Sequence, residues 1–280
     1  MARPQTIEPA PPPVDIIEGE GPVILCQPHS GTWLPASLYG TLNERGRALA
    51  DTDWHVDRLY EGLLSAATII HARFHRYVID ANRPPSGASL YPGQNTTGLC
   101  PLTNFDGAAI YEQGREPDAT EIEARRLEFH SRYHAAIERA IARAKARHGL
   151  AVIYDCHSIR SRIPYLFDGE LPVFNIGTNG GASCDPRFES AVREICAASG
   201  ESWVLNGRFK GGWTTRQYGK PQENVHAIQM ELAQRAYMSE APPWEYEREK
   251  AAALRKTLVK ILEAIREVGH TPASSWIRSS

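Results

Sequence analysis

Two histidines follow short apolar segments, in positions that suit a metal site. His29 comes shortly after the apolar run Val23–Gln27. His157 comes shortly after a second run, Ala151–Tyr154. Apolar runs of this length, bounded by helix and loop signals, are typical of buried parallel strands. Ligands of open α/β sheets bind beyond the carboxyl ends of such strands, so the pair predicts two ligands of one metal. A lone histidine is more often a hydrogen-bonded core residue.

A carboxylate is expected as the third ligand, because catalytic zinc sites often combine histidines with one acid and leave a position for water. In zinc sites with an H-x-x-E motif the acid lies three residues after the first histidine, but Thr32 stands there in this chain. The acid must therefore come from elsewhere, and Asp53 and Asp51 are the candidates. Both also suit a helix cap or an exposed acidic turn, so their spacing leaves the choice open.

Glu231 is the candidate for acid–base chemistry. It lies inside the apolar run Val225–Ala233, where a period of two places it on the same face as Gln229. A buried glutamate is costly unless it is paired, and loss of solvation raises its pKa. A raised pKa suits a general base. The alternative is a structural ion pair with an arginine.

Cationic side chains crowd the loops expected beyond the strand ends. Asn82 and Arg83 stand before two prolines that close a short predicted strand, Tyr77–Ile79. The other cations in such loops are Arg160, Arg162, Arg208, Lys210 and Arg216. In a protein of net charge −2 this enrichment indicates a small anionic substrate, because a guanidinium binds a carboxylate through parallel hydrogen bonds. For a single arginine, a surface or structural ion pair is the commoner role.

The composition indicates a soluble globular protein of 280 residues, with 42% hydrophobic and 23% charged residues. We expect a flexible Pro-rich arm over residues 1–13 and a single domain over residues 14–280. The net charge of −2 gives no drive towards nucleic acid or an anionic membrane. The N-terminal residues lack the apolar segment of a signal peptide and no run is long enough to span a bilayer, so we expect a cytoplasmic protein.

Strands that alternate with helices predict α/β architecture around a mixed, largely parallel sheet. Besides the runs above, strands are expected at Val14–Ile17, Thr68–His71 and Trp203–Leu205. Helices are expected over Thr120–His148, with a capping box from Thr120 and Glu123 and a stop at Gly149, over Pro186 to Gly200 behind the cap Asp185, and over Pro243–Val268. The segment Ser86–Asp118 is predicted to be a long loop of the kind that often forms a lid or a binding loop.

Six short motifs in a fixed order resemble the N-formylglutamate amidohydrolases, also called N-formylglutamate deformylases. They are Q-P-H-S-G, D-T-D-W-H-V-D-R-L-Y, V-I-D-A-N-R-P, D-C-H-S-I-R-S, L-N-G-R-F-K-G-G and A-I-Q-M-E-L-A. The likeness runs from about Val23 to Met238. It implies a three-layer α/β sandwich of the phosphorylase/hydrolase-like type, related to the zinc carboxypeptidases.

The same resemblance implies one zinc ion (Zn2+) and the hydrolysis of N-formyl-L-glutamate to formate and glutamate, in histidine degradation. It implies His29, His157 and Asp53 as zinc ligands, with Asp51 as the competitor of Asp53, and Glu231 as the general base. Asn82 and Arg83 resemble the pair that holds a substrate carboxylate, and we expect Arg160 or Arg208 to hold the second one. Thr32 departs from the H-x-x-E pattern of the wider group.

Three alternatives remain beside this interpretation. A metal-free hydrolase would use Cys156 or Ser30 as its nucleophile. A non-catalytic binder of acidic metabolites is a different class, although Glu231 and a full ligand set speak against it. Within the enzymes, the alternative is hydrolysis of another N-acylated acidic amino acid or related acid.

Overall fold

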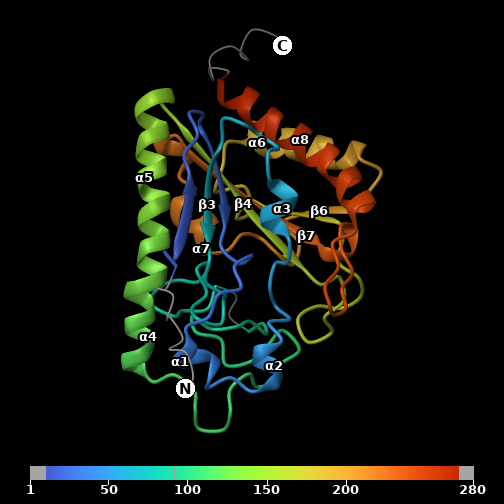
Figure 1. Cartoon of the computed structure of the whole chain (residues 1–280). Coiled ribbons are helices and arrows are strands. Elements are labelled where there is room, and N and C mark those ends of the chain that lie inside the picture. Colours follow the sequence, from blue (N-terminus) through green and yellow to red (C-terminus); the bar gives the residue numbers. More distant parts are fainter. Residues whose placement is uncertain (1–10, 91–92, 271–280) are drawn as a thin grey trace, which may run out of the picture.

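A seven-stranded mixed sheet forms the centre of the molecule (Figure 1). The structure is a computed structural model that describes residues 11–90 and 93–270. In spatial order the strands are β1 (Val14–Ile17), β3 (Thr68–Ala72), β2 (Val23–Gln27), β4 (Ala151–Ile159), β7 (Val225–Ala233), β5 (Phe174–Gly177) and β6 (Trp203–Leu205). Only the β1–β3 and β5–β7 pairs of this sheet are antiparallel. The predicted α/β class with a mixed, largely parallel sheet is confirmed.

Helices cover both faces of the sheet, which gives three layers (Figure 1). On one face, α5 (Ser131–His148) packs on β1 to β4, and α7 (Trp213–Tyr218) packs on β4 and β7. On the other face lie α3 (Val56–Tyr60), α6 (Pro186–Ala198) and α8 (Arg248–His270). The sheet is thus buried on both sides, which explains why its central strands are apolar without interruption.

Successive residues of the central strands serve opposite cores. Ile24 and Ile153 pack with the residues of α5, whereas Leu25 and Tyr154 pack with those of α3, α6 and α8. All four side chains are buried. Burial of one such side chain contributes about 1.5–3 kcal/mol, so the two cores fix the sheet firmly beneath the loops at its edge.

The long predicted helix is present, but it is interrupted and capped differently. The structure has α4 (Ala119–Arg125), a π-helical turn over Arg126–His130 and then α5. The capping box from Thr120 and Glu123 is wrong, because the Asp118 carboxylate accepts the hydrogen bond from the Glu121 N–H at 2.8 Å and caps the helix from outside. The predicted stop at Gly149 is confirmed, with a φ of 74°.

Two predicted strands differ from the structure. Tyr77–Ile79 is not a strand, because the Val78 N–H closes a turn on the His75 carbonyl. These residues are apolar because they fill the core beneath α5, not because they belong to the sheet. The strand at Ala151 continues to Ile159, since its backbone pairs with β7 through Ile159 and Ala233 despite the polar side chains.

The last helix begins at Arg248 and not at Pro243, because residues up to Glu247 pair back on the chain around Tyr237. The strand β5 has no counterpart among the sequence predictions. The short helices are α1 (Ala36–Tyr39), α2 (Glu44–Arg47) and the 3-10 turns Pro221–Glu223 and Gln234–Ala236. Most of the predicted arm over residues 1–13 lies outside the described residues.

Long connections gather at the carboxyl ends of β2, β4 and β7, at the bottom of Figure 1. The described parts of the predicted loop Ser86–Asp118 contain no helix or strand apart from isolated bridges. No helix within residues 11–90 and 93–270 is long and apolar enough to cross a membrane. The predicted site residues come together at this edge of the sheet.

Candidate active site and metal centre

Three predicted ligands converge on one point. His29 follows β2, His157 lies on β4 and Asp53 precedes α3. The two Nδ1 atoms are 3.2 Å apart, and Asp53 Oδ2 lies 3.2 Å from His157 Nδ1 and 3.8 Å from His29 Nδ1. All three side chains are buried. No other group of His, Cys, Asp or Glu in the described part of the chain offers three such atoms together.

This arrangement fits zinc in chemistry and in size. Two imidazole nitrogens and one carboxylate oxygen are a common ligand set of catalytic zinc sites. Bonds of about 2.0–2.1 Å in a tetrahedron place neighbouring ligand atoms about 3.3 Å apart, close to the separations seen here. Without a metal between them, two facing imidazole Nδ1 atoms and a carboxylate would be buried at a cost in free energy.

Buried acids hold the far side of each imidazole. Asp80 Oδ1 lies 2.7 Å from His29 Nε2, and Asp155 Oδ2 lies 3.1 Å from His157 Nε2. Such carboxylate–histidine pairs fix the ring and place the proton on Nε2, so that Nδ1 is free for a metal. Asn82 supports the Asp155–His157 pair, because its Nδ2 atom donates to Asp155 Oδ2 at 3.3 Å.

Asp53 is bound on both of its oxygens. The Arg76 guanidinium forms a short ion pair with Oδ1, and the Ser158 N–H donates to Oδ2 at 3.1 Å. Although burial alone would raise the pKa of Asp53, the adjacent Arg76 and His157 hold it below its ordinary value. The Asp53 carboxylate is therefore ionised, as a metal ligand must be.

The two imidazoles differ in charge. Burial, together with Arg76, lowers the pKa of His29, so this ring is neutral. Burial alone would lower the pKa of His157 as well, but the Asp155 carboxylate holds it well above its ordinary value. A metal that binds His157 must displace a proton, so metal binding should weaken as the pH falls.

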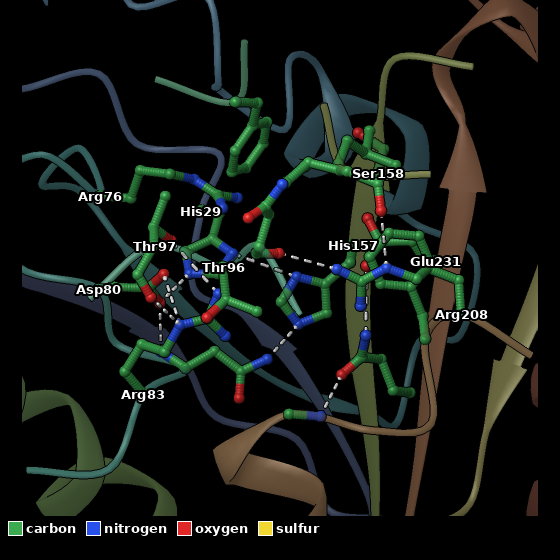
Figure 2. A pocket seen from close by; sticks show the side chains of 18 residues that line it. His29, Arg76, Asp80, Arg83, Thr96, Thr97, His157, Ser158, Arg208 and Glu231 are labelled. Atoms are coloured by element: carbon green, nitrogen blue, oxygen red, sulfur yellow. Dashed lines mark hydrogen bonds and ion pairs between the residues drawn. The ribbon is translucent and has the colours of Figure 1, made fainter. Parts of the chain in front are cut away.

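Glu231 lies opposite His157 in the pairing of β4 with β7. It is 6% exposed, and burial raises its pKa to about 8. Figure 2 shows Glu231, His157 and Ser158 on the wall of one pocket. A carboxyl group with a raised pKa, in the same pocket as three atoms that could hold a metal, is suited to accept and return a proton.

The pocket over this cluster is open to solvent and carries two arginines. Arg83 and Arg208 both line it, and they are drawn on opposite sides of His157 in Figure 2. Arg83 donates to the Thr97 carbonyl at 3.0 Å and Arg208 donates to the Asn95 carbonyl at 3.1 Å. The predicted loop Ser86–Asp118 thus supplies part of the pocket wall. Whether it moves as a lid stays a prediction.

Two candidates lie outside this pocket. Arg160 pairs with Asp106 at 2.9 Å and does not line the pocket. The Asp51 carboxylate accepts hydrogen bonds from the Tyr77 hydroxyl and the Phe105 N–H, both at 2.8 Å. Asp51 thus holds the loop that carries Phe105, whereas Asp53 faces the histidines.

The geometry speaks against the metal-free alternative. Cys156 points into the core beneath α3, α6 and α8, and burial raises the pKa of its thiol well above the ordinary value. Such a thiol is inert. Ser30 Oγ has no hydrogen-bond partner among the described residues, so no base is in place to activate it.

Sequence reasoning missed three members of the site: Arg76, Asp80 and Asp155, the last of which stands two residues before His157 on β4. Arg76 stands among the apolar residues of Phe74–Ile79, and a cation in such a stretch was itself a signal; in the structure it is only 5% exposed. Asp80 stands two residues before Asn82, and its role depends on a contact with His29, which is distant from it in the sequence. Only the fold reveals that contact.

Comparisons with known proteins agree with this geometry. The sequence profile described as N-formylglutamate amidohydrolase matches residues 21–238. The chain belongs to the N-formylglutamate amidohydrolase family. It is 47% identical to an N-formylglutamate deformylase of Pseudomonas aeruginosa over 250 residues, which cover 88% of this chain and 93% of that protein. It is 42% identical to an N-formylglutamate deformylase of Pseudomonas putida, over 89% of this chain and 93% of that one.

A solved member of the N-formylglutamate amidohydrolase family has the same fold. The crystal structure of N-formylglutamate amidohydrolase from Ralstonia eutropha superposes with a TM-score of 0.76 at 28% identity, over 92% of this chain and 99% of that one. A gene product of Agrobacterium tumefaciens shares the fold at a TM-score of 0.67 and 20% identity, over 91% and 95% of the two chains. The resemblance found in the sequence is confirmed.

Asp155→Asn should weaken zinc binding about 10–100-fold, because the carboxylate that orients His157 is replaced by an uncharged amide. Competition with a chromophoric chelator measures this affinity. Asp51→Asn is the matched control, since Asp51 is as buried but contacts neither histidine. An unchanged affinity in Asp155→Asn would show that Asp155 does not support a metal ligand.

Glu231→Gln should stabilise the metal-free protein at alkaline pH. The folded-state pKa of about 8 lies above the ordinary value of 4.5, so ionisation of Glu231 opposes folding progressively as the pH rises between these values. We expect the variant to melt at a higher temperature than the wild type at pH ~8.5, with the difference shrinking towards pH ~5. The exposed Glu263→Gln serves as control. Parallel melting curves at all pH values would contradict the buried ionisation.

Proposed function

We propose that the protein is a zinc-dependent amidohydrolase that converts N-formyl-L-glutamate and water into formate and L-glutamate, in histidine degradation. One observation carries the proposal: His29, His157 and Asp53 present three ligand atoms beside the buried Glu231, in a pocket with two arginines. The names of the relatives at 47% and 42% identity support the substrate. The family resemblance supports the metabolic setting.

The proposed ligands would hold a zinc ion, which supplies a Lewis acid that activates water and polarises a carbonyl group. Glu231 acts on protons. Its carboxylate takes a proton from the attacking water and then delivers it to the leaving amine nitrogen, so the carboxylate is restored at the end of the cycle. The pKa of about 8, raised by burial, suits both halves of this exchange.

Arg83 and Arg208 are proposed to bind the two carboxylates of the substrate. Both guanidinium groups now donate to carbonyl oxygens of the loop, at Thr97 and Asn95. A carboxylate accepts stronger hydrogen bonds than a carbonyl does, so the substrate would take over part of these contacts. Asn82 lines the same pocket as the histidines and Arg83, and we assign it to the same binding region.

The decisive experiment is formate release from N-formyl-L-glutamate. The protein is assayed as isolated, after removal of metal with dipicolinate, and after addition of zinc. Turnover that disappears on chelation and returns with zinc establishes the reaction and the metal together. A zinc-loaded protein that releases no formate overturns the proposed substrate, and the assay then moves to other N-acylated acidic amino acids.

Glu231→Gln should lower kcat about 10²–10⁴-fold, because the general base is replaced by an isosteric amide. The zinc content, measured by atomic absorption, should stay at the wild-type level because Glu231 is not a ligand. Near-normal kcat would remove Glu231 from the mechanism. Loss of zinc from the variant would instead point to a role in metal binding.

Arg83→Met and Arg208→Met should each lower kcat/KM for N-formyl-L-glutamate about 10–100-fold, since one charge-assisted contact contributes about 1.5–3 kcal/mol. The loss should be much smaller for a neutral substrate, the N-formylglutamine amide. Arg160→Met is the matched control, because Arg160 lies outside the pocket. Equal losses on both substrates would show that the arginine does not bind a carboxylate.

A further inference from the structure

The amino terminus of α7 fixes two buried amide side chains. The Gly212 N–H donates to Gln229 Oε1 at 2.7 Å, and the Thr214 N–H donates to Asn82 Oδ1 at 2.8 Å. These N–H groups belong to the first turn of a helix, where the helix itself offers no acceptor. Each amide therefore satisfies a backbone donor that would otherwise be buried without a partner.

These contacts decide which way each amide points. The oxygen and nitrogen of an amide are hard to tell apart by shape, but a backbone N–H can only donate. The oxygens of Gln229 and Asn82 must therefore face α7, and their NH2 groups face the pocket. Asn82 Nδ2 donates to Asp155 Oδ2 at 3.3 Å, and Gln229 Nε2 donates to Glu231 Oε2 at 3.2 Å.

Gly212 allows this close approach. A Cβ atom at this position would lie 2.3 Å from Asn82 Nδ2, so a larger residue would displace the amide. The Trp213 N–H also donates to the main-chain carbonyl of Asn82, at 3.2 Å. The start of α7 is thus packed against Asn82. The Gly212 N–H that donates to Gln229 belongs to this packed segment.

We propose that Gln229 is a positioning residue that holds the Glu231 carboxylate towards the reacting water. Gln229 is 4% exposed and stands two residues before Glu231 on the same face of β7. Its NH2 group donates to one oxygen of the carboxylate, which leaves the second oxygen, Oε1, for the proton of the water. Without Gln229, Glu231 has no hydrogen-bond donor that fixes its rotamer among those found in the described residues.

This inference rests on the proposed role of Glu231 and makes a separate prediction. Gln229→Met keeps the length of the side chain and removes the amide. We expect kcat for N-formyl-L-glutamate to fall about 10–100-fold, with KM within about threefold and the zinc content unchanged, because positioning acts on the chemical step alone. A rise in KM at constant kcat would show that Gln229 binds the substrate, which would overturn the proposal.

Asn175 offers a matched control. It is 1% exposed, and its Nδ2 donates at 3.0 Å to the main-chain carbonyl of Glu231, not to its side chain. Asn175→Ala therefore removes a buried amide that contacts the main chain of Glu231, but leaves the hydrogen bond from Gln229 to the Glu231 carboxylate in place. We expect a lower melting temperature with kcat within about threefold of the wild type. An equal fall of kcat in both variants would show that only the placement of β7 matters.

The double variant with Glu231→Gln tests whether Gln229 acts through Glu231. If it does, Gln229→Met should cost no more than about twofold when Glu231 is already replaced, whereas independent effects multiply. Multiplied losses would overturn the proposal. If Gln229→Met does not fold, Gln229→Asn takes its place, since the shorter amide cannot reach Glu231 from the same backbone.

Crystal structures of the zinc-loaded wild type and Gln229→Met give a result that needs no turnover. The Glu231 carboxylate should leave its wild-type position or lose its order in the variant, while His29 and Asp53 stay in place. An unmoved, ordered Glu231 would overturn the proposal. If the wild type releases no formate, the proposed function fails on that assay, and the two structures alone decide the role of Gln229.

Discussion

The parallel pairing of β4 with β7 is the constraint on which the site depends. The register sets His157 opposite Glu231 and Asp155 opposite Gln229. Because side chains alternate along a strand, these residues reach the same face at the same level, and a slip of one residue would turn all of them into an apolar core. Ile228 and Met230 on the opposite face are fully buried beneath α3, α6 and α8, so the register is held by packing far from the chemistry.

A second constraint is the cost of buried charge. Asp53, Asp80, Asp155 and Arg76 are all at most 5% exposed, in a region where isolated charges are strongly disfavoured. Arg76 pairs with Asp53, and the other two acids each pair with a histidine of the cluster. Removal of a single member leaves the others uncompensated, which explains why the cluster is expected to respond to mutation as a unit. Such a site is stable only when its charges balance, and a bound cation would add to that balance.

Much of this arrangement was available from the sequence. The apolar runs before His29 and His157 predicted buried strands, and the strand-end rule brought the two histidines to one edge. The spacing alone left the choice between Asp51 and Asp53 open, because both stand in the same irregular turn, and only the family resemblance favoured Asp53. In the structure Asp53 faces the histidines. The prediction of a strand at Tyr77–Ile79 was wrong because a buried turn and a buried strand can have the same apolar composition. Arg76 and Asp80 act through contacts between distant segments, which no local pattern contains.

The ion pair between Arg76 and Asp53 has a consequence for the choice of metal. Since the guanidinium binds Oδ1, only Oδ2 of Asp53 faces the histidines, so the proposed ligation by Asp53 would be monodentate. Three protein donors of which two are nitrogens suit a metal with a low coordination number and leave one position for water or substrate. Calcium and magnesium prefer six or more oxygen ligands, often with a bidentate carboxylate in the case of calcium. In the proposed zinc site, the guanidinium would thereby disfavour these abundant ions without contacting the metal itself.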